Sequence, residues 1–139
     1  MLLDVVLALG IIALLALLVA PRPRAGVGEV ELKAEAALVA ASFRTARADA
    51  IRERSHADVT VDPQARAIAY RGQLAHRVRD GVAVDWATSN LCPVVDGTRS
   101  LRFLADGRSC GAVMTLSASG RSTRLRVDWL TGRVEISDQ

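Results

Sequence analysis

Few residues in this chain have the types and spacing that covalent or metal chemistry requires. His56 and His76 are the only histidines, and neither belongs to a His-Glu-x-x-His pattern. Cys92 and Cys110 lie far apart without a Cys-x-x-Cys pair, which argues against a zinc site. The serines have no Gly-x-Ser-x-Gly elbow around them. The sequence therefore predicts no enzyme activity, no metal site and no cofactor.

Asp4 is the residue whose chemistry demands a partner. It precedes an uninterrupted apolar run, residues 5–20, which stops at Pro21-Arg22-Pro23-Arg24. A charged side chain near the core of a bilayer costs about 2.5–3.5 kcal/mol and is kept mainly where a partner neutralises it. We therefore expect Asp4 to pair with a positive charge.

The apolar run after Asp4 has three interpretations: a secretory signal peptide, a plain membrane anchor, or a helix that packs with its counterparts in an assembly. It holds about 16 residues, on the order of 24 Å as a helix, which is slightly short of a usual span. A signal peptide would begin with a basic region and end at a small-residue cleavage site, and both features are missing. A plain anchor tolerates an acid at its end but does not account for the break at Pro21.

A second helix is predicted over residues 30–54, after a join that prolines and glycines interrupt. Apolar residues recur there at three-to-four spacing and define the face expected to pack on the rest of the chain. These residues are Val30, Ala34, Ala37, Leu38, Ala41, Ala48 and Ile51.

From residue 57 onward the helical period gives way to alternation, which predicts strands. Residues 58–62 and 67–71 flank a four-residue turn and read as a β-hairpin. Further strands are predicted at residues 75–79, 82–86, 100–104, 113–117, 124–129 and 133–136, separated by Asp-Gly and similar turns. An antiparallel sandwich or open barrel follows, with Tyr70, Trp86, Phe103 and Trp129 expected in its core.

An apolar helix with an acid near its start, a later proline, an alanine-rich continuation and a small β-domain together resemble the type IV pilin and type II secretion pseudopilin superfamily. Asp4 falls where that superfamily has its glutamate, and Pro21 falls where it has its helix-breaking proline. Asp is one methylene shorter than Glu, and the family's basic leader and aromatic first residue are missing before Leu2. Arg22 and Arg24 follow the run, so the positive-inside rule makes an upstream basic leader an expectation of this interpretation.

Residues 103–109, 114–117 and 125–134, together with the helix end at residues 46–51, resemble the H-type minor pseudopilins, the GspH/FimT family. The resemblance implies an α+β, pilin-like fold with a long N-terminal helix packed on a C-terminal antiparallel β-sandwich. It implies a membrane and assembly helix over residues 1–21, its amphipathic continuation over 22–56 and a periplasmic β-domain over 57–139.

The same resemblance implies a structural role at or near the tip of the periplasmic pseudopilus of a type II secretion system. Partners would be other minor and major pseudopilins, the inner membrane before assembly, and secreted substrates or the secretin. Asp4 would pair with a neighbour's N-terminal ammonium in the apolar core of the filament, which fixes the register of the subunits.

Two alternatives stay open. Some minor pilins of this family bind DNA through C-terminal arginines in a Gly-Arg-x-Arg pattern, and here Arg121, Arg124, Arg126 and Arg133 are candidates, although Glu135 replaces the second arginine after Gly132. A single-pass sensor protein would need only the anchor and the sandwich. Cys92 and Cys110 form either a disulfide, as expected in an oxidising periplasm, or two buried free thiols.

Overall fold

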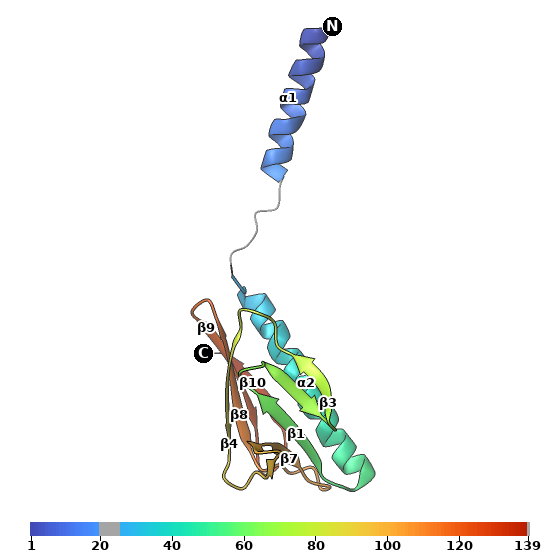
Figure 1. Cartoon of the computed structure of the whole chain (residues 1–139), viewed down its shortest axis with the longest axis vertical. Coiled ribbons are helices and arrows are strands. Elements are labelled where there is room, and N and C mark those ends of the chain that lie inside the picture. The colour runs from blue at the N-terminus through green and yellow to red at the C-terminus, as the bar shows by residue number, and fades with distance from the viewer. Residues whose placement is uncertain (20–25, 139) are drawn as a thin grey trace.

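The computed structural model describes residues 1–19 and 26–138 and contains two helices followed by a β-domain (Figure 1). Pro21, with the residues from 20 to 25 around it, lies outside the described part of the chain. The helices are α1 (Leu2–Val19) and α2 (Glu29–Glu53). The strands are β1 (Ala57–Asp62), β2 (Ala67–Tyr70), β3 (Gln73–Arg77), β4 (Ala83–Thr88), β5 (Val94–Val95), β6 (Thr98–Arg99), β7 (Leu101–Phe103), β8 (Ala112–Ala118), β9 (Arg121–Val127) and β10 (Val134–Asp138).

The strands form two antiparallel sheets of four, ordered β3-β2-β1-β7 and β10-β9-β8-β4, and a small β5-β6 pair. The predicted hairpin at residues 58–71 is confirmed as β1 and β2, with Val59 opposite Tyr70 and Asp62 opposite Ala67. β8 and β9 meet at Ser119-Gly120, both with positive φ, which is the turn geometry that a two-residue hairpin requires. α2 runs along the domain and packs on strands of both sheets (Figure 1). The structure is therefore α+β, with a helix packed on an antiparallel β-domain, as predicted.

The packing face of α2 differs from the sequence-based prediction. The predicted face is turned outward, with Val30 79% and Leu38 51% exposed. The buried face carries Leu32, Ala36, Val39, Ala40, Phe43, Ala46 and Ala50, interleaved with Glu35 and Asp49. The prediction was wrong because this alanine-rich helix has apolar residues on two faces, and the face with the larger side chains also holds two acids.

The core lies between α2 and the inner faces of the sheets. Phe43 of α2 is fully buried, and its ring lies 5.9 Å from that of Trp86 on β4. The sheets contribute Val59, Val61, Ile68, Leu101, Phe103, Met114, Leu116, Leu125 and Val127, all buried. Alternating burial along β8 and β9 produces this inner face.

Of the four aromatic residues expected in the core, Phe103 is buried, while Tyr70 and Trp86 are partly buried against it. Trp129 is 61% exposed, so its assignment to the core was wrong. β9 ends at Val127, and Asp128 starts a turn in which its Oδ1 accepts hydrogen bonds from the amides of Leu130 and Thr131, each at 2.9 Å. The strand alternation therefore stops two residues before Trp129.

Two polar ties hold α2 to β10, the edge strand beside it. Lys33 Nζ lies 3.0 Å from Asp138 Oδ2 at one end of the strand. Arg44 Nη2 donates to the carbonyl of Val134 at the other end, at 3.1 Å. In the described part of the chain β10 is paired with β9 alone, so these contacts help to hold an edge strand in place.

Candidate functional site

The first turn of α1 places Asp4 next to the chain's own amino terminus. The α-amine of Met1 lies 3.5 Å from Asp4 Oδ2, and both groups are almost fully exposed. Exposed ion pairs stabilise by about 0–1 kcal/mol, so this pairing leaves Asp4 able to exchange partners at little cost.

The side chains of residues 1–16 are all exposed, although most are apolar. Leu2, Val6 and Ile12 are 84%, 63% and 62% exposed, respectively. A continuous apolar surface of this kind marks a site of contact with protein or lipid. Within residues 1–19 and 26–138, no helix is both long enough and apolar enough to cross a membrane.

Cys92 and Cys110 form a disulfide, with their Cα atoms 5.1 Å apart. Cys92 is buried and lies between β4 and β5, whereas Cys110 lies two residues before β8. The bridge thus ties the segment that leads into β5 and β6 to the segment that leads into β8, an inner strand of the β10-β9-β8-β4 sheet.

The four arginines considered for DNA binding do not gather at one point. Arg121, Arg124 and Arg126 lie along β9, while Arg133 lies in the turn before β10. Arg121 and Arg133 are near opposite ends of the β9-β10 hairpin, about 20 Å apart at the rise of a strand. Glu135 sits opposite Arg126 in the register, and its Oε1 lies 3.7 Å from Arg133 Nη1. The positive charge along this hairpin is therefore interrupted by an acid.

A buried acid of α2 connects the helix to β3 and the loop after it. Glu35 is 5% exposed, and its Oε2 lies 3.0 Å from His76 Nε2. Its Oε1 lies 3.6 Å from Arg79 Nε. His76 therefore serves as a partner of a buried carboxylate, a role that was not predicted from the sequence. A buried carboxylate needs such partners because an isolated charge in the core is costly.

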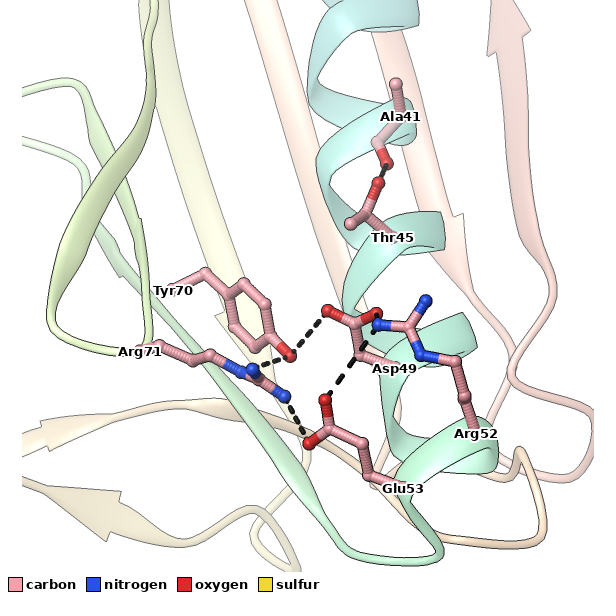
Figure 2. A network of polar contacts seen from close by, with 7 residues as sticks. All are labelled: Ala41, Thr45, Asp49, Arg52, Glu53, Tyr70 and Arg71. Carbon is pink, nitrogen blue, oxygen red and sulfur yellow. Dashed lines mark hydrogen bonds and ion pairs between the residues drawn. The ribbon is translucent and has the colours of Figure 1, made fainter.

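A second polar network joins the C-terminal end of α2 to the β2-β3 hairpin (Figure 2). Asp49 accepts a hydrogen bond from Tyr70 Oη at 3.1 Å and pairs with Arg52. Arg71 Nε donates to Tyr70 Oη at 2.9 Å, and its guanidinium also pairs with Glu53. Figure 2 shows these side chains converging between the helix and the hairpin.

The network shifts the pKa values of its members in the directions that its contacts dictate. Burial raises the pKa of Tyr70 above its usual range. The hydrogen bond from Arg71 lowers the pKa of Glu53 and, reciprocally, raises that of Arg71. At neutral pH Tyr70 therefore keeps its proton, and Glu53 and Arg71 keep their charges.

The networks around Glu35 and Asp49 could have been predicted from one feature of the sequence. Glu35 and Asp49 lie on the helix face that carries Leu32, Ala36, Val39, Phe43 and Ala46. Acids within the larger apolar stripe of a helix require buried partners, and the β2-β3 hairpin and the loop after it supply them.

The chain resembles known proteins in sequence and in fold, although no protein-family model matches it. It is 26% identical over 133 residues to the type II secretion system protein H of Xanthomonas campestris pv. campestris, a match that covers 96% of this chain and 79% of that protein. This sequence likeness includes the first helix and the β-domain.

Two solved structures show the same fold. The minor pseudopilin EpsH from the type 2 secretion system of Vibrio cholerae matches with a TM-score of 0.61 and 15% identity, over 78% of this chain and 97% of EpsH. The type IV minor pilin FimU of Pseudomonas aeruginosa matches with a TM-score of 0.56 and 16% identity, over 77% of this chain and 88% of FimU. At these identities the likenesses concern the fold.

Proposed function

We propose that this chain, a pilin-like protein of the GspH type, is a minor pseudopilin of a type II secretion system. It is a structural subunit at or near the tip of the periplasmic pseudopilus and supports the export of folded proteins across the outer membrane. The observation that carries this proposal is the likeness to a type II secretion protein H along 96% of the chain.

The first helix supports an assembly role. An apolar helix whose described side chains are exposed needs a bilayer or other helices to cover it. Before assembly, the apolar run that begins at Val5 would lie in the inner membrane, with the globular domain in the periplasm. In the filament, other pseudopilins would cover α1, and Pro21, which lies between α1 and α2 in the sequence, would serve as the superfamily's helix-breaking proline.

Asp4 is the residue that we assign to subunit register. Its carboxylate would exchange the Met1 amine for the N-terminal ammonium of a neighbouring subunit. In the apolar core of a filament an unpaired charge costs several kcal/mol, so only a register that pairs Asp4 would be stable.

The proposal is tested by deleting the gene and measuring how much of a secreted hydrolase reaches the medium and how much stays in the periplasm. We expect periplasmic retention, reversed by the wild-type gene. Unchanged secretion would contradict the proposal and would favour the alternative, a type IV minor pilin that binds DNA. That alternative has less support, because Glu135 lies opposite Arg126 and 3.7 Å from Arg133, among its candidate arginines.

The role of Asp4 is tested in the same strain by complementing with Asp4→Ala and Asp4→Glu. Asp4→Ala should leave the protein folded and membrane-bound but absent from sheared filaments, with the hydrolase retained. Asp4→Glu keeps the charge and should restore secretion. Normal secretion by Asp4→Ala would remove the main argument for a register contact.

A further inference from the structure

A shallow hollow with an excess of positive charge lies between α2 and the turn that precedes β10. It measures about 540 Å³ and is lined by Arg44, Arg47, Thr131, Gly132, Arg133 and Val134. The lining contains three guanidinium groups and no carboxylate. The nearest acid to one of them is Glu135, whose contact with Arg133 at 3.7 Å joins two exposed side chains and is therefore weak.

The two arginines from α2 are held in place by uncharged acceptors. Arg47 Nε donates to the carbonyl of Gly107 at 2.9 Å, and its Nη2 donates to that of Thr131 at 3.0 Å. Arg44 Nη2 donates to the carbonyl of Val134. Within residues 1–19 and 26–138, neither arginine has a carboxylate within ion-pair distance. Their charges are oriented but not neutralised.

Donors remain available on both guanidinium groups. A guanidinium carries five N–H groups in a planar fork; these contacts use two on Arg47 and one on Arg44. The remaining forks match the two oxygens of a carboxylate, which arginine binds in a bidentate manner. The hollow is thus built to accept one or two carboxylates.

The turn that forms one wall of the hollow is rigid and displays apolar side chains. The hydroxyl of Ser109 donates to the Asp128 carbonyl at 2.9 Å, and Gly132 donates to the same carbonyl, also at 2.9 Å. Trp129 and Leu130 of this turn are 61% and 55% exposed, and Trp129 lines a separate hollow together with residues of β4 and β8. Tryptophan and arginine are the residue types most enriched at energetically dominant contacts between proteins. A preorganised turn also loses little entropy when a partner binds.

We propose that this hollow binds the carboxylate side chains of an acidic segment on a neighbouring protein subunit. The identity of the neighbour as a pseudopilus subunit rests on the proposed function, whereas the carboxylate site rests on the geometry alone. Nucleic acid fits less well, because a phosphate backbone needs a track of cations and here they are concentrated at one point.

The test uses the purified full-length chain in a non-ionic detergent and a fluorescein-labelled hexaglutamate peptide, with binding measured by anisotropy at low ionic strength. The double variant Arg44→Gln, Arg133→Gln should weaken binding about tenfold, since it removes two of the three guanidinium charges that line the hollow. Arg77→Gln removes the same kind of exposed charge from β3 and should have little effect. Circular dichroism checks that each variant is folded.

Three outcomes would overturn the inference: no binding of hexaglutamate above that of hexaglutamine, equal weakening by Arg77→Gln, or tighter binding of a single-stranded oligonucleotide that the double variant abolishes. The last result would assign the hollow to nucleic acid. Because this assay uses purified protein, its failure leaves the secretion phenotype of the deletion strain unaffected. The two proposals therefore fail separately.

Discussion

Loss of the Cys92–Cys110 disulfide should destabilise the domain by about 3 kcal/mol. The bridge closes a loop with a sequence separation of 18. For a loop of that size the chain-entropy relation gives roughly 11 cal/mol/K of entropy removed from the unfolded state, or about 3 kcal/mol near room temperature. The loop contains β5, β6 and β7, and of these β7 is also held by its pairing with β1.

The assay is urea unfolding of the full-length chain in detergent, followed by tryptophan fluorescence. With a urea dependence of about 1.5 kcal/mol/M, the expected loss moves the unfolding midpoint by about 2 M. The double variant Cys92→Ala, Cys110→Ala removes the bridge permanently, and reduction of the wild type removes it without changing the sequence. Both samples should shift together.

The reasoning fails if the double alanine variant and oxidised wild type unfold at the same urea concentration. A shift in the alanine variant alone, with reduced wild type unchanged, would also refute it, because packing of Cys92 and not loop closure would then be responsible. The urea dependence of the unfolding free energy provides an additional check. It should be larger without the disulfide, because an uncrosslinked unfolded chain exposes more surface.

The remaining predictions concern α2, two glycines and one acid. Phe43→Ala should lower the unfolding free energy by about 3–5 kcal/mol, because Phe43 is fully buried. Leu38→Ala, on the exposed face, should change it by no more than about 0.5 kcal/mol. Equal losses for the two variants in denaturant titrations would contradict the observed packing face. Gly132→Ala should lower the melting temperature more than Gly72→Ala. Both glycines have positive φ, but of the two only Gly132 would place an added Cβ against another atom, 1.9 Å from the Gly107 carbonyl oxygen. Similar shifts in melting temperature would show that backbone conformation alone matters. The hydrogen bond from the amide of Thr131 holds the pKa of Asp128 below its usual range. An acid whose pKa is lower in the folded state than in the unfolded state stabilises the fold at pH values above its unfolded-state pKa. This stabilisation is lost as the pH falls through the folded-state pKa. The stability difference between wild type and Asp128→Ala should therefore be constant at neutral pH and shrink below about pH 4. A stability difference that grows as the pH is lowered would contradict this prediction.

Much of the β-domain could be predicted from the sequence because its signals are local. Alternation identified the strands that became β1, β2, β7, β8 and β9, and Asp-Gly or Ser-Gly pairs located several turns. The short β5-β6 pair was missed, because two residues per strand give no alternation to detect. The end of β9 was misplaced because the Asp128 turn interrupts an otherwise continuous pattern.

The packing of α2 could not be predicted in the same way. Alanines populate two faces of the helix, and choosing between them requires knowing which face meets the sheets. The polar ties at Glu35 and Asp49 depend on partners that lie far away in sequence, at His76 and Tyr70. The arginine-lined hollow combines helix residues with a turn more than eighty residues later. The hollow and the partners of the two acids arise from tertiary contacts and leave no periodic signal, whereas the acids themselves are recognisable within the apolar stripe of α2.

The ties between α2 and the sheets have a mechanical consequence. Lys33 and Arg44 fasten the helix to β10, while Glu35 and Asp49 fasten it through His76 and Tyr70 to the other sheet. Sliding the helix along its axis would break contacts to both sheets at once and expose the packed ring of Phe43. An axial force applied to α2 would therefore be transmitted to both sheets together.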